Sequence, residues 1–169
     1  EQIDNLSGIA TAFSDFAKMP QGEFRKIDIE PILLSTVELF RESDNVEINL
    51  SYPENECIVL GDKDQLMRVF TNIIKNSTQA IPENKQGIID IIVNDKSTYF
   101  LITIKDNGVG IPEEKRAHIF EPNFTTKSSG TGLGLAISKN IIERMNGKIW
   151  FDSVVNEYSE FYIQLPKST

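Results

Sequence analysis

Residues 87–106 contain two strand-like runs, "GIIDIIVND" and "YFLITIKD", which a short polar turn near residues 95–98 separates. Apolar residues recur at every second position in both runs, which is the period of a strand. Two neighbouring runs of this kind predict an antiparallel hairpin. Strands that come in hairpins do not fit the regular strand–helix alternation of a parallel dinucleotide-binding fold, so this feature strongly restricts the fold class.

Single helices are predicted between the other strands of the chain. The further strands are expected at residues 24–29, 46–52, 57–60, 148–154 and 157–166, and the helices at residues 30–43, 62–80 and 133–145. Asp62 is the expected N-cap of the long central helix, and Asn146-Gly147 marks the end of the last one. This order favours an α+β fold, a two-layer sandwich in which helices cover one face of a mixed β-sheet.

Residues 1–19 have the apolar spacing of an amphipathic helix, with Ile3 and Leu6 on its apolar face. Pro20 and Gly22 mark its end. Two interpretations stay open: the helix packs on its own domain, or it is half of a helical hairpin or dimer bundle. Because the chain begins with Glu, we expect it to be part of a longer protein.

The charge of the chain restricts its partners. The formal net charge is −8, which argues against nucleic acid or an anionic membrane as the main partner. A phosphate ligand is not excluded, because backbone N–H groups and a few local cations can bind it. Cys57 is the single cysteine, so no internal disulfide can form, and no apolar run approaches the roughly 20 residues of a membrane span. We expect this part of the protein to be soluble.

Three glycines at positions 130, 132 and 134 lead directly into the last predicted helix. Glycines let a backbone approach a ligand closely, and the start of a helix offers unpaired N–H groups and a positive dipole end. Together they predict an anion site that suits a polyphosphate. The alternative is a flexible turn without a ligand, since neither a Walker A loop nor a strand-led Rossmann fingerprint is present.

Asp106 ends a very apolar strand and begins the run "DNGVGIP". A carboxylate at the edge of the core needs a partner, and Gly108 and Gly110 leave space beside it. An adenine amine would satisfy this carboxylate, whereas a guanine oxygen would leave both groups unpaired. The alternative is an Asx-type turn at a strand end.

Asn72 and Asn76 are four residues apart in the central helix and therefore share one face. Amide oxygens there suit a hydrated Mg²⁺ or a phosphate, with Arg68 nearby to add charge. The alternative is a solvated or internally bonded pair of amides.

In "IFEPNFTTK", aromatic residues flank a proline turn and Lys127 follows, which suits a lid that closes on a phosphate. His118 is interpreted as an exposed residue of this lid, residues 117–131.

In this order, these motifs resemble the ATP-binding domain of sensor histidine kinases, whose wider relatives are the gyrase, Hsp90 and MutL ATPases. Residues 65–81 are similar to the family's N box, 106–112 to its G1 box, 119–127 to its F box and 130–142 to its G2 box. The resemblance covers residues 23–166 and implies the Bergerat ATP-binding fold. The run "FSDFAKMP" is similar to the end of the dimerisation hairpin in nitrogen-regulation sensors of the NtrB/NtrY kind. The implied division is a dimerisation helix in residues 1–22 and a catalytic domain in residues 23–169.

The resemblance also implies a role for each motif residue. Asn76 would bind Mg²⁺, Asn72 would lie near the γ-phosphate, and Lys127 would supply charge; these three form the implied catalytic set. The gyrase-like relatives carry a glutamate at the position of Asn72, and an amide cannot act as that general base. The implied nucleotide-binding residues are Asn76, Asp106, Gly108, Gly110, Ile111, Phe120, Thr126, Lys127, Gly130, Thr131, Gly132, Leu133 and Gly134.

The implied activity is transfer of the ATP γ-phosphate to a histidine on the dimerisation helices of a homodimer, for relay to the receiver domain of a response regulator. The family's acceptor histidine precedes the first residue here, so we expect this chain to bind ATP and Mg²⁺ without phosphorylating itself. A cytoplasmic location is implied, in a family many of whose full-length sensors are anchored in the inner membrane. The alternatives are a gyrase-like ATPase, an anti-sigma-like serine kinase and a degenerate nucleotide-binding scaffold.

Overall fold

The computed structural model describes residues 10, 14, 22–41, 45–122 and 132–169. Most of the helix predicted over residues 1–19, and residues 123–131 of the predicted lid, lie outside this set. The elements are β1 (Arg25–Asp28), α2 (Ile29–Glu38), β2 (Val46–Ser51), β3 (Ile58–Gly61), α3 (Lys63–Ala80), β4 (Gly87–Asp95), β5 (Tyr99–Asp106), α4 (Glu113–Arg116), α5 (Gly134–Arg144), β6 (Lys148–Val154) and β7 (Tyr158–Pro166).

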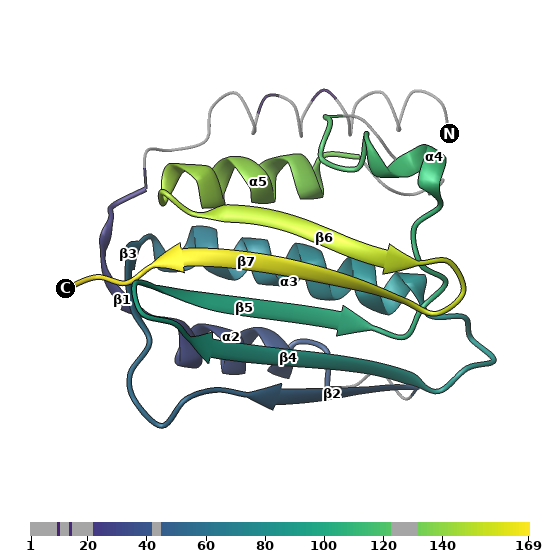
Figure 1. The fold of residues 1–169 in the computed structure, drawn as a ribbon, viewed down its shortest axis with the longest axis horizontal. Coiled ribbons are helices and arrows are strands. Elements are labelled where there is room, and N and C mark those ends of the chain that lie inside the picture. The colour runs from purple at the N-terminus through teal and green to yellow at the C-terminus, as the bar shows by residue number, and fades with distance from the viewer. Residues whose placement is uncertain (1–9, 11–13, 15–21, 42–44, 123–131) are drawn as a thin grey trace.

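Five strands form the main sheet in the order β2-β4-β5-β7-β6 (Figure 1). The predicted hairpin of β4 and β5 is present, with Ile91 opposite Ile104, and β6 and β7 form the closing hairpin. β2 pairs with β4 in parallel, which makes the sheet mixed, as predicted. β1 and β3 pair with each other in a separate two-stranded sheet, which the sequence analysis did not anticipate.

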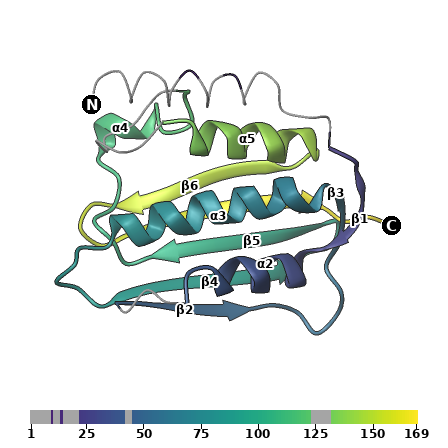
Figure 2. The same ribbon diagram turned by 180° about the vertical axis from the view of Figure 1, so that it is seen from behind.

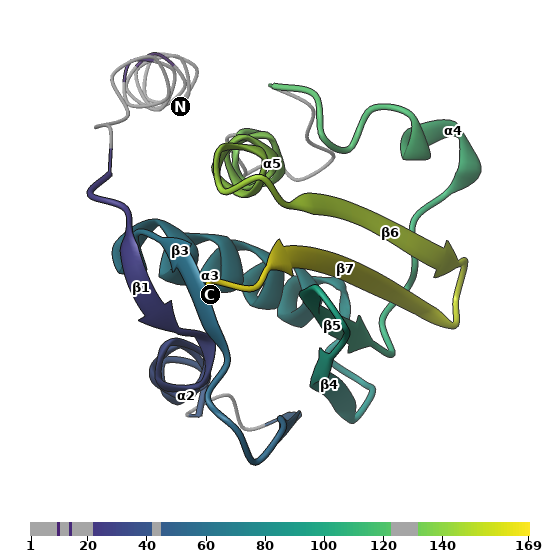
Figure 3. The same cartoon turned by 60° about the vertical axis from the view of Figure 1, so that its left-hand side comes forward.

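The helices α2, α3 and α5 cover one face of the main sheet (Figures 2 and 3). α3 lies centrally and packs against both α2 and α5. Its buried side chains are Leu66, Val69, Phe70, Ile73, Ile74 and Ser77. The opposite face of the sheet is open and carries the stacked rings of Trp150 and Tyr162, 5.4 Å apart. The predicted two-layer α+β sandwich is therefore confirmed.

Local side chains explain where the helices start and end. Asp62 accepts a hydrogen bond from the Gln65 N–H at 2.9 Å, which confirms the predicted N-cap of α3. Asp28 caps α2 in a related way through the Glu30 N–H. After α5, Asn146 adopts a left-handed conformation with φ 57°, which ends the helix where the sequence predicted.

Two predicted boundaries need correction. α2 ends at Glu38 and not at residue 43, because the N–H groups of residues 39–41 bond to carbonyls three residues back, the tight pattern of a last helical turn. The helix α4 was not predicted. Its four residues are too few to show a helical period, although Pro112 followed by two glutamates is a typical helix start.

In the segments that the structure describes, no helix is both long enough and apolar enough to cross a membrane.

Candidate functional site

Asp106 is the last residue of β5, and its side chain is buried with 2% of its surface exposed. Its carboxylate accepts a hydrogen bond from the Gly108 N–H at 2.9 Å. This contact is the Asx-type turn that the sequence offered as an alternative, and it fixes the orientation of the carboxylate. A carboxylate has about four acceptor positions, so this turn is compatible with a further ligand amine.

The Asp106 loop (residues 106–112) rests on the C-terminal end of α3. The Val109 N–H donates to the Ala80 carbonyl at 2.9 Å. A Cβ on Gly108 would lie 2.7 Å from the same carbonyl oxygen, so only glycine allows this close approach. The Asn107 side chain joins the loop to the start of β4, where its oxygen accepts from the Ile88 N–H at 2.9 Å.

The same loop is held on its other side by the hairpin of β6 and β7. The Asn156 N–H donates to the Val109 carbonyl at 2.8 Å, and the Ile111 N–H donates to the Ser153 hydroxyl at 2.8 Å. Gly110 has φ 72°, and a Cβ there would overlap the carbonyl of Val154. Both predicted glycines of this loop are thus required by the packing of the loop itself.

Asn72 joins α3 to the first residue of α5. Its side-chain nitrogen donates to the Gly134 carbonyl at 3.1 Å and to the Ser138 hydroxyl at 3.4 Å. The Ser138 hydroxyl donates to the same Gly134 carbonyl at 2.9 Å. Asn72 is therefore the internally bonded amide that the sequence offered as an alternative, and it holds the start of α5 in place.

No side chain of a described residue caps the N-terminus of α5, whereas Asp28 and Asp62 cap the starts of α2 and α3. Leu133 occupies the N-cap position and is buried, while Gly132 before it has φ 66°. The first backbone N–H groups of an uncapped helix need an acceptor from elsewhere. A phosphate group would satisfy them.

α3 connects these two regions. Asn72 contacts the start of α5, Ala80 contacts the Asp106 loop, and Asn76 lies between them, one helical turn from each. At 1.5 Å per residue, the two contacts are about 12 Å apart along the helix. Asn76 is half-buried and makes no side-chain hydrogen bond to another residue in the described ranges. Arg68 is exposed.

The described start of the predicted lid packs on the sheet. The Phe120 ring meets the Phe151 ring edge-on at 6.0 Å, and the ammonium group of Lys139 lies 5.9 Å from the centre of the Phe120 ring. His118 is exposed, as predicted, and its Nδ1 lies 2.8 Å from the Glu121 carboxylate. The predicted residues Thr126, Lys127, Gly130 and Thr131 lie outside the described residues.

Three supporting residues escaped the sequence analysis: Asn107, Arg116 and Ser153. Ser153 follows Ile149 and Phe151 at the inward-facing positions of β6. A small polar residue in that series is a usable signal, because a buried hydroxyl needs a hydrogen-bond partner. The Arg116 guanidinium donates to the Ser153 carbonyl, a contact between α4 and β6 that no local pattern could indicate.

The acidic residues and the cysteine offer no separate metal site. Across the ranges given above, no group of three or more His, Cys, Asp and Glu side chains could hold a metal ion. Burial raises the pKa of Cys57 to about 11, so its thiol stays protonated and unreactive at neutral pH. The amide oxygen of Asn76 is compatible with Mg²⁺, which prefers oxygen ligands and keeps several waters beside substrate phosphates.

Residues 61–169 match the family of histidine kinase-, DNA gyrase B- and HSP90-like ATPases. Sporulation kinase A of Bacillus subtilis (strain 168) is 40% identical over 124 residues, which is 73% of this chain and 20% of that protein. The sensor histidine kinase ZraS of Escherichia coli (strain K12) is 30% identical over 169 residues, 98% of this chain and 36% of ZraS. The chain thus spans well under half the length of these relatives.

The fold of the chain is also similar to solved structures of histidine kinases. The nucleotide-free catalytic domain of the histidine kinase ThkA aligns with a TM-score of 0.77 and 33% identity, over 86% of this chain and 96% of that domain. ThkA in complex with the response regulator protein TrrA aligns with a TM-score of 0.77 and 25% identity, over 98% of this chain and 49% of ThkA. The chain belongs to the family of histidine kinase-, DNA gyrase B- and HSP90-like ATPases.

Proposed function

We propose that this chain is the ATP-binding catalytic part of a sensor histidine kinase. In the full protein it transfers the γ-phosphoryl group of ATP to a histidine of the dimerisation helices, from which the group passes to a response regulator. The named relatives and the ThkA structures support a kinase over the other activities of the family. The finer likeness to nitrogen-regulation sensors stays a prediction.

The observation that carries this proposal is the pair of contacts made by α3. One helix holds the loop that begins with the buried Asp106, through the contact of Ala80 with Val109, and the start of α5, through Asn72. A carboxylate that can accept a hydrogen bond from an amine and a helix start that can bind an anion are thus held by one helix, at contact points about 12 Å apart along its axis. An adenine nucleotide carries groups that complement both, an amine on its base and phosphate groups at its other end.

On the base side, the Asp106 carboxylate accepts from the exocyclic amine of adenine. The Gly108 N–H fixes one carboxylate oxygen at 2.9 Å, so the carboxylate is oriented before the ligand arrives. A guanine would place a carbonyl oxygen there, and two facing acceptors leave a buried charge unsatisfied. This asymmetry selects ATP over GTP.

On the phosphate side, the backbone N–H groups at Gly132, Leu133 and Gly134 bind phosphate oxygens, and Lys127 neutralises charge. Asn76 holds Mg²⁺ through its amide oxygen, and the ion, when bound, neutralises the phosphate charge. Phosphoryl transfer depends mostly on such positioning and neutralisation. Thr126, Gly130 and Thr131 complete the proposed phosphate site, with Phe120 at the base of the lid.

Asn72 argues against a hydrolytic ATPase. Its nitrogen donates to the Gly134 carbonyl, and a neutral amide cannot remove a proton from water. The lack of a general base at Asn72 suits a kinase, because ATP is not hydrolysed and its phosphoryl group is kept for a histidine acceptor.

The partners follow from the same proposal. We assign residues 1–22 to the end of a dimerisation helix and residues 23–169 to the catalytic domain, since the match to ZraS extends over 98% of the chain. A homodimer and the receiver domain of a response regulator are the proposed protein partners. ThkA has been crystallised with the response regulator protein TrrA, which supports the second of these.

Calorimetric titration tests the proposal. The chain is titrated with a non-hydrolysable ATP analogue and separately with the matching GTP analogue, each with and without Mg²⁺. We expect binding in the micromolar range for the adenine ligand alone, strengthened by Mg²⁺. Equal binding of both analogues would contradict the Asp106 assignment, and binding of neither would contradict the proposed function.

The variant Asn76→Ala tests whether Asn76 is responsible for the effect of Mg²⁺ on nucleotide affinity. The variant should lose the Mg²⁺-dependent part of the affinity and keep the rest, because Asn76 makes no hydrogen bond to the other described residues whose loss would disturb the fold.

A further inference from the structure

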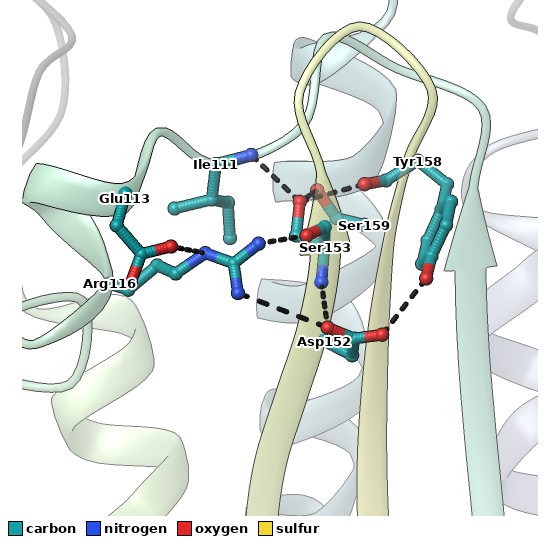
Figure 4. A network of polar contacts seen from close by, with 7 residues as sticks. All are labelled: Ile111, Glu113, Arg116, Asp152, Ser153, Tyr158 and Ser159. Carbon is teal, nitrogen blue, oxygen red and sulfur yellow. Dashed lines mark hydrogen bonds and ion pairs between the residues drawn. The ribbon is translucent and has the colours of Figure 1, made fainter.

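Ser153 is a buried serine near the end of β6, with 1% of its surface exposed. Ile149 and Phe151 precede it on the same inward-facing side of the strand. A hydroxyl in that environment is stable only when its hydrogen-bonding capacity is used. Figure 4 shows the polar contacts that surround it, made by Ile111, Glu113, Arg116, Asp152, Ser153, Tyr158 and Ser159.

The Ser153 hydroxyl uses all of its hydrogen-bonding positions. It donates its proton to the Tyr158 carbonyl at 2.7 Å and accepts from the Ile111 N–H at 2.8 Å. The Ser159 hydroxyl, 3.3 Å away, supplies a second and weaker donor. A hydroxyl has one proton and two lone pairs, so no other partner is required. The contact with Ile111 joins the Asp106 loop to the hairpin, while the contacts with Tyr158 and Ser159 stay within the hairpin.

The backbone of Ser153 forms a second contact, with the helix α4. Its carbonyl accepts a hydrogen bond from the Arg116 guanidinium on α4. Arg116 also forms an ion pair with Glu113 at 3.2 Å and lies 3.9 Å from the Asp152 carboxylate. These charges keep the guanidinium directed at β6 (Figure 4). One residue of β6 therefore holds both ends of the segment from Ile111 to Arg116.

This segment joins the Asp106 loop to the start of the predicted lid. Pro112, directly after Ile111, has a fixed φ, and α4 forms the rest of the segment, so the backbone between the two attachment points has little freedom. The position of Ile111 consequently depends on the hairpin and not only on the loop's own sequence.

We propose that Ser153 is a positioning residue for nucleotide binding: its hydroxyl and carbonyl fix the segment from Ile111 to Arg116 and thereby the wall of the adenine pocket. This inference rests on the proposed function, because it assigns Ile111 to the nucleotide site. Ser153 itself touches no nucleotide. It acts through the Ile111 backbone, and none of its hydrogen bonds involves Asn76.

Ser153→Ala removes the acceptor of the Ile111 N–H and leaves that donor without a partner. We expect ADP to bind on the order of tenfold more weakly, the effect of one lost buried hydrogen bond. The loss should be the same with and without Mg²⁺, in contrast to Asn76→Ala. Ser159→Ala is the matched control, since the hydroxyl of this neighbouring buried serine contacts the Ser153 hydroxyl and no residue from Ile111 to Arg116. Ser159 also stands opposite Asp106 in the pairing of β7 with β5, but alanine keeps that backbone pairing, so the variant should bind ADP as the wild type does.

Amide hydrogen exchange followed by NMR separates positioning from general destabilisation. In Ser153→Ala the Ile111 amide should lose protection, while the Asn156 amide, which donates to the Val109 carbonyl, should keep it. If Ser153→Ala does not fold, Arg116→Gln removes the second attachment at a partly exposed side chain and should weaken ADP binding in the same Mg²⁺-independent way.

The outcomes separate the two proposals. Wild-type ADP binding together with an unchanged affinity in Ser153→Ala would overturn the positioning role alone. A loss of affinity that depends on Mg²⁺, or one shared equally by Ser159→Ala, would overturn it too. Failure of the wild type to bind ADP would instead overturn the proposed function.

Discussion

The helix α3 holds two segments of the proposed site, the Asp106 loop at Ala80 and the start of α5 at Asn72, and it holds them in different ways. At Ala80, the Asp106 loop is fixed from α3, from the start of β4 and from the hairpin of β6 and β7. At Asn72, the described start of α5 is tied to α3 by one amide side chain, helped by Ser138. The proposed base side is thus held by several elements of the fold, whereas at the proposed phosphate side no side chain of a described residue caps the start of α5.

This difference has a physical reason. A carboxylate that is to recognise a base must be held in a fixed place, because a displaced hydrogen-bond partner discriminates poorly. Phosphates carry several equivalent oxygens and strong charge, so backbone N–H groups and cations can bind them with less exact geometry. In the proposed site, specificity for the base therefore depends on the Asp106 loop, and affinity comes from both the Asp106 loop and the start of α5.

Asp106→Asn should have the largest effect. The amide keeps the shape of the side chain but replaces a charge-assisted acceptor by a neutral one, and we expect ATP-analogue affinity to fall on the order of 100-fold. Calorimetry measures it. Asp90→Asn, on the open face of the sheet where Asp90 accepts from Asn49, should bind as the wild type does. An unchanged affinity in Asp106→Asn would remove the base-reading role.

Gly110→Ala and Gly134→Ala compare the two sides directly. Gly110 has φ 72° and no room for a Cβ, so its substitution should lower the free energy of unfolding by about 1–3 kcal/mol. At Gly134 a Cβ would lie 3.5 Å from the nearest Asn72 atom, an ordinary contact, and stability should change by less than about 1 kcal/mol. Urea unfolding checks both. Equal losses would show that the phosphate side is as tightly packed as the base side.

Asn72→Ala should lower the free energy of unfolding by about 1 kcal/mol. The Gly134 carbonyl keeps its hydrogen bond from Ser138, so the loss concerns one donor and not a whole network. Lys75→Ala, at an exposed position of the same helix, is the control. The same urea titration gives the value, and a stability equal to that of the control variant would mean that the amide does not tie α5 to α3.

Tyr158→Phe should have the smallest effect. The Tyr158 hydroxyl donates to the Asp152 carboxylate at 2.9 Å and thereby lowers the pKa of Asp152, while this contact raises the pKa of Tyr158. The Asp152 contribution is present above the ordinary carboxyl pKa of about 3.9 and is lost as the pH falls through the lowered value. The Tyr158 contribution is lost as the pH rises through its raised value.

In Tyr158→Phe, the pKa of Asp152 should therefore move up toward the ordinary range. An NMR titration of the Asp152 carboxyl carbon measures the shift. Because both side chains are at the surface, the change in stability should be slight. An unmoved pKa would mean that the Ser153 N–H and Arg116 hold the carboxylate without the tyrosine.

The sequence by itself determined the elements and the local chemistry. The alternating isoleucines predicted the hairpin of β4 and β5, Asp62 predicted the start of α3, and "DNGVGIP" predicted a carboxylate beside a glycine turn. These features succeed because periodicity, capping and turn formation depend on residues a few positions apart. The same approach did not predict α4, since a helix of four residues is too short to show a period.

The tertiary structure decided what holds the site together. The contact of Asn72 with Gly134 spans 62 residues, and that of Ile111 with Ser153 spans 42. No local pattern encodes such a pairing, because it follows from how β7 and β6 add to the sheet beside β5 and how α5 packs on α3. The sequence predicted the residues that we propose to bind a ligand, and packing across the sheet decided which residues hold them in place.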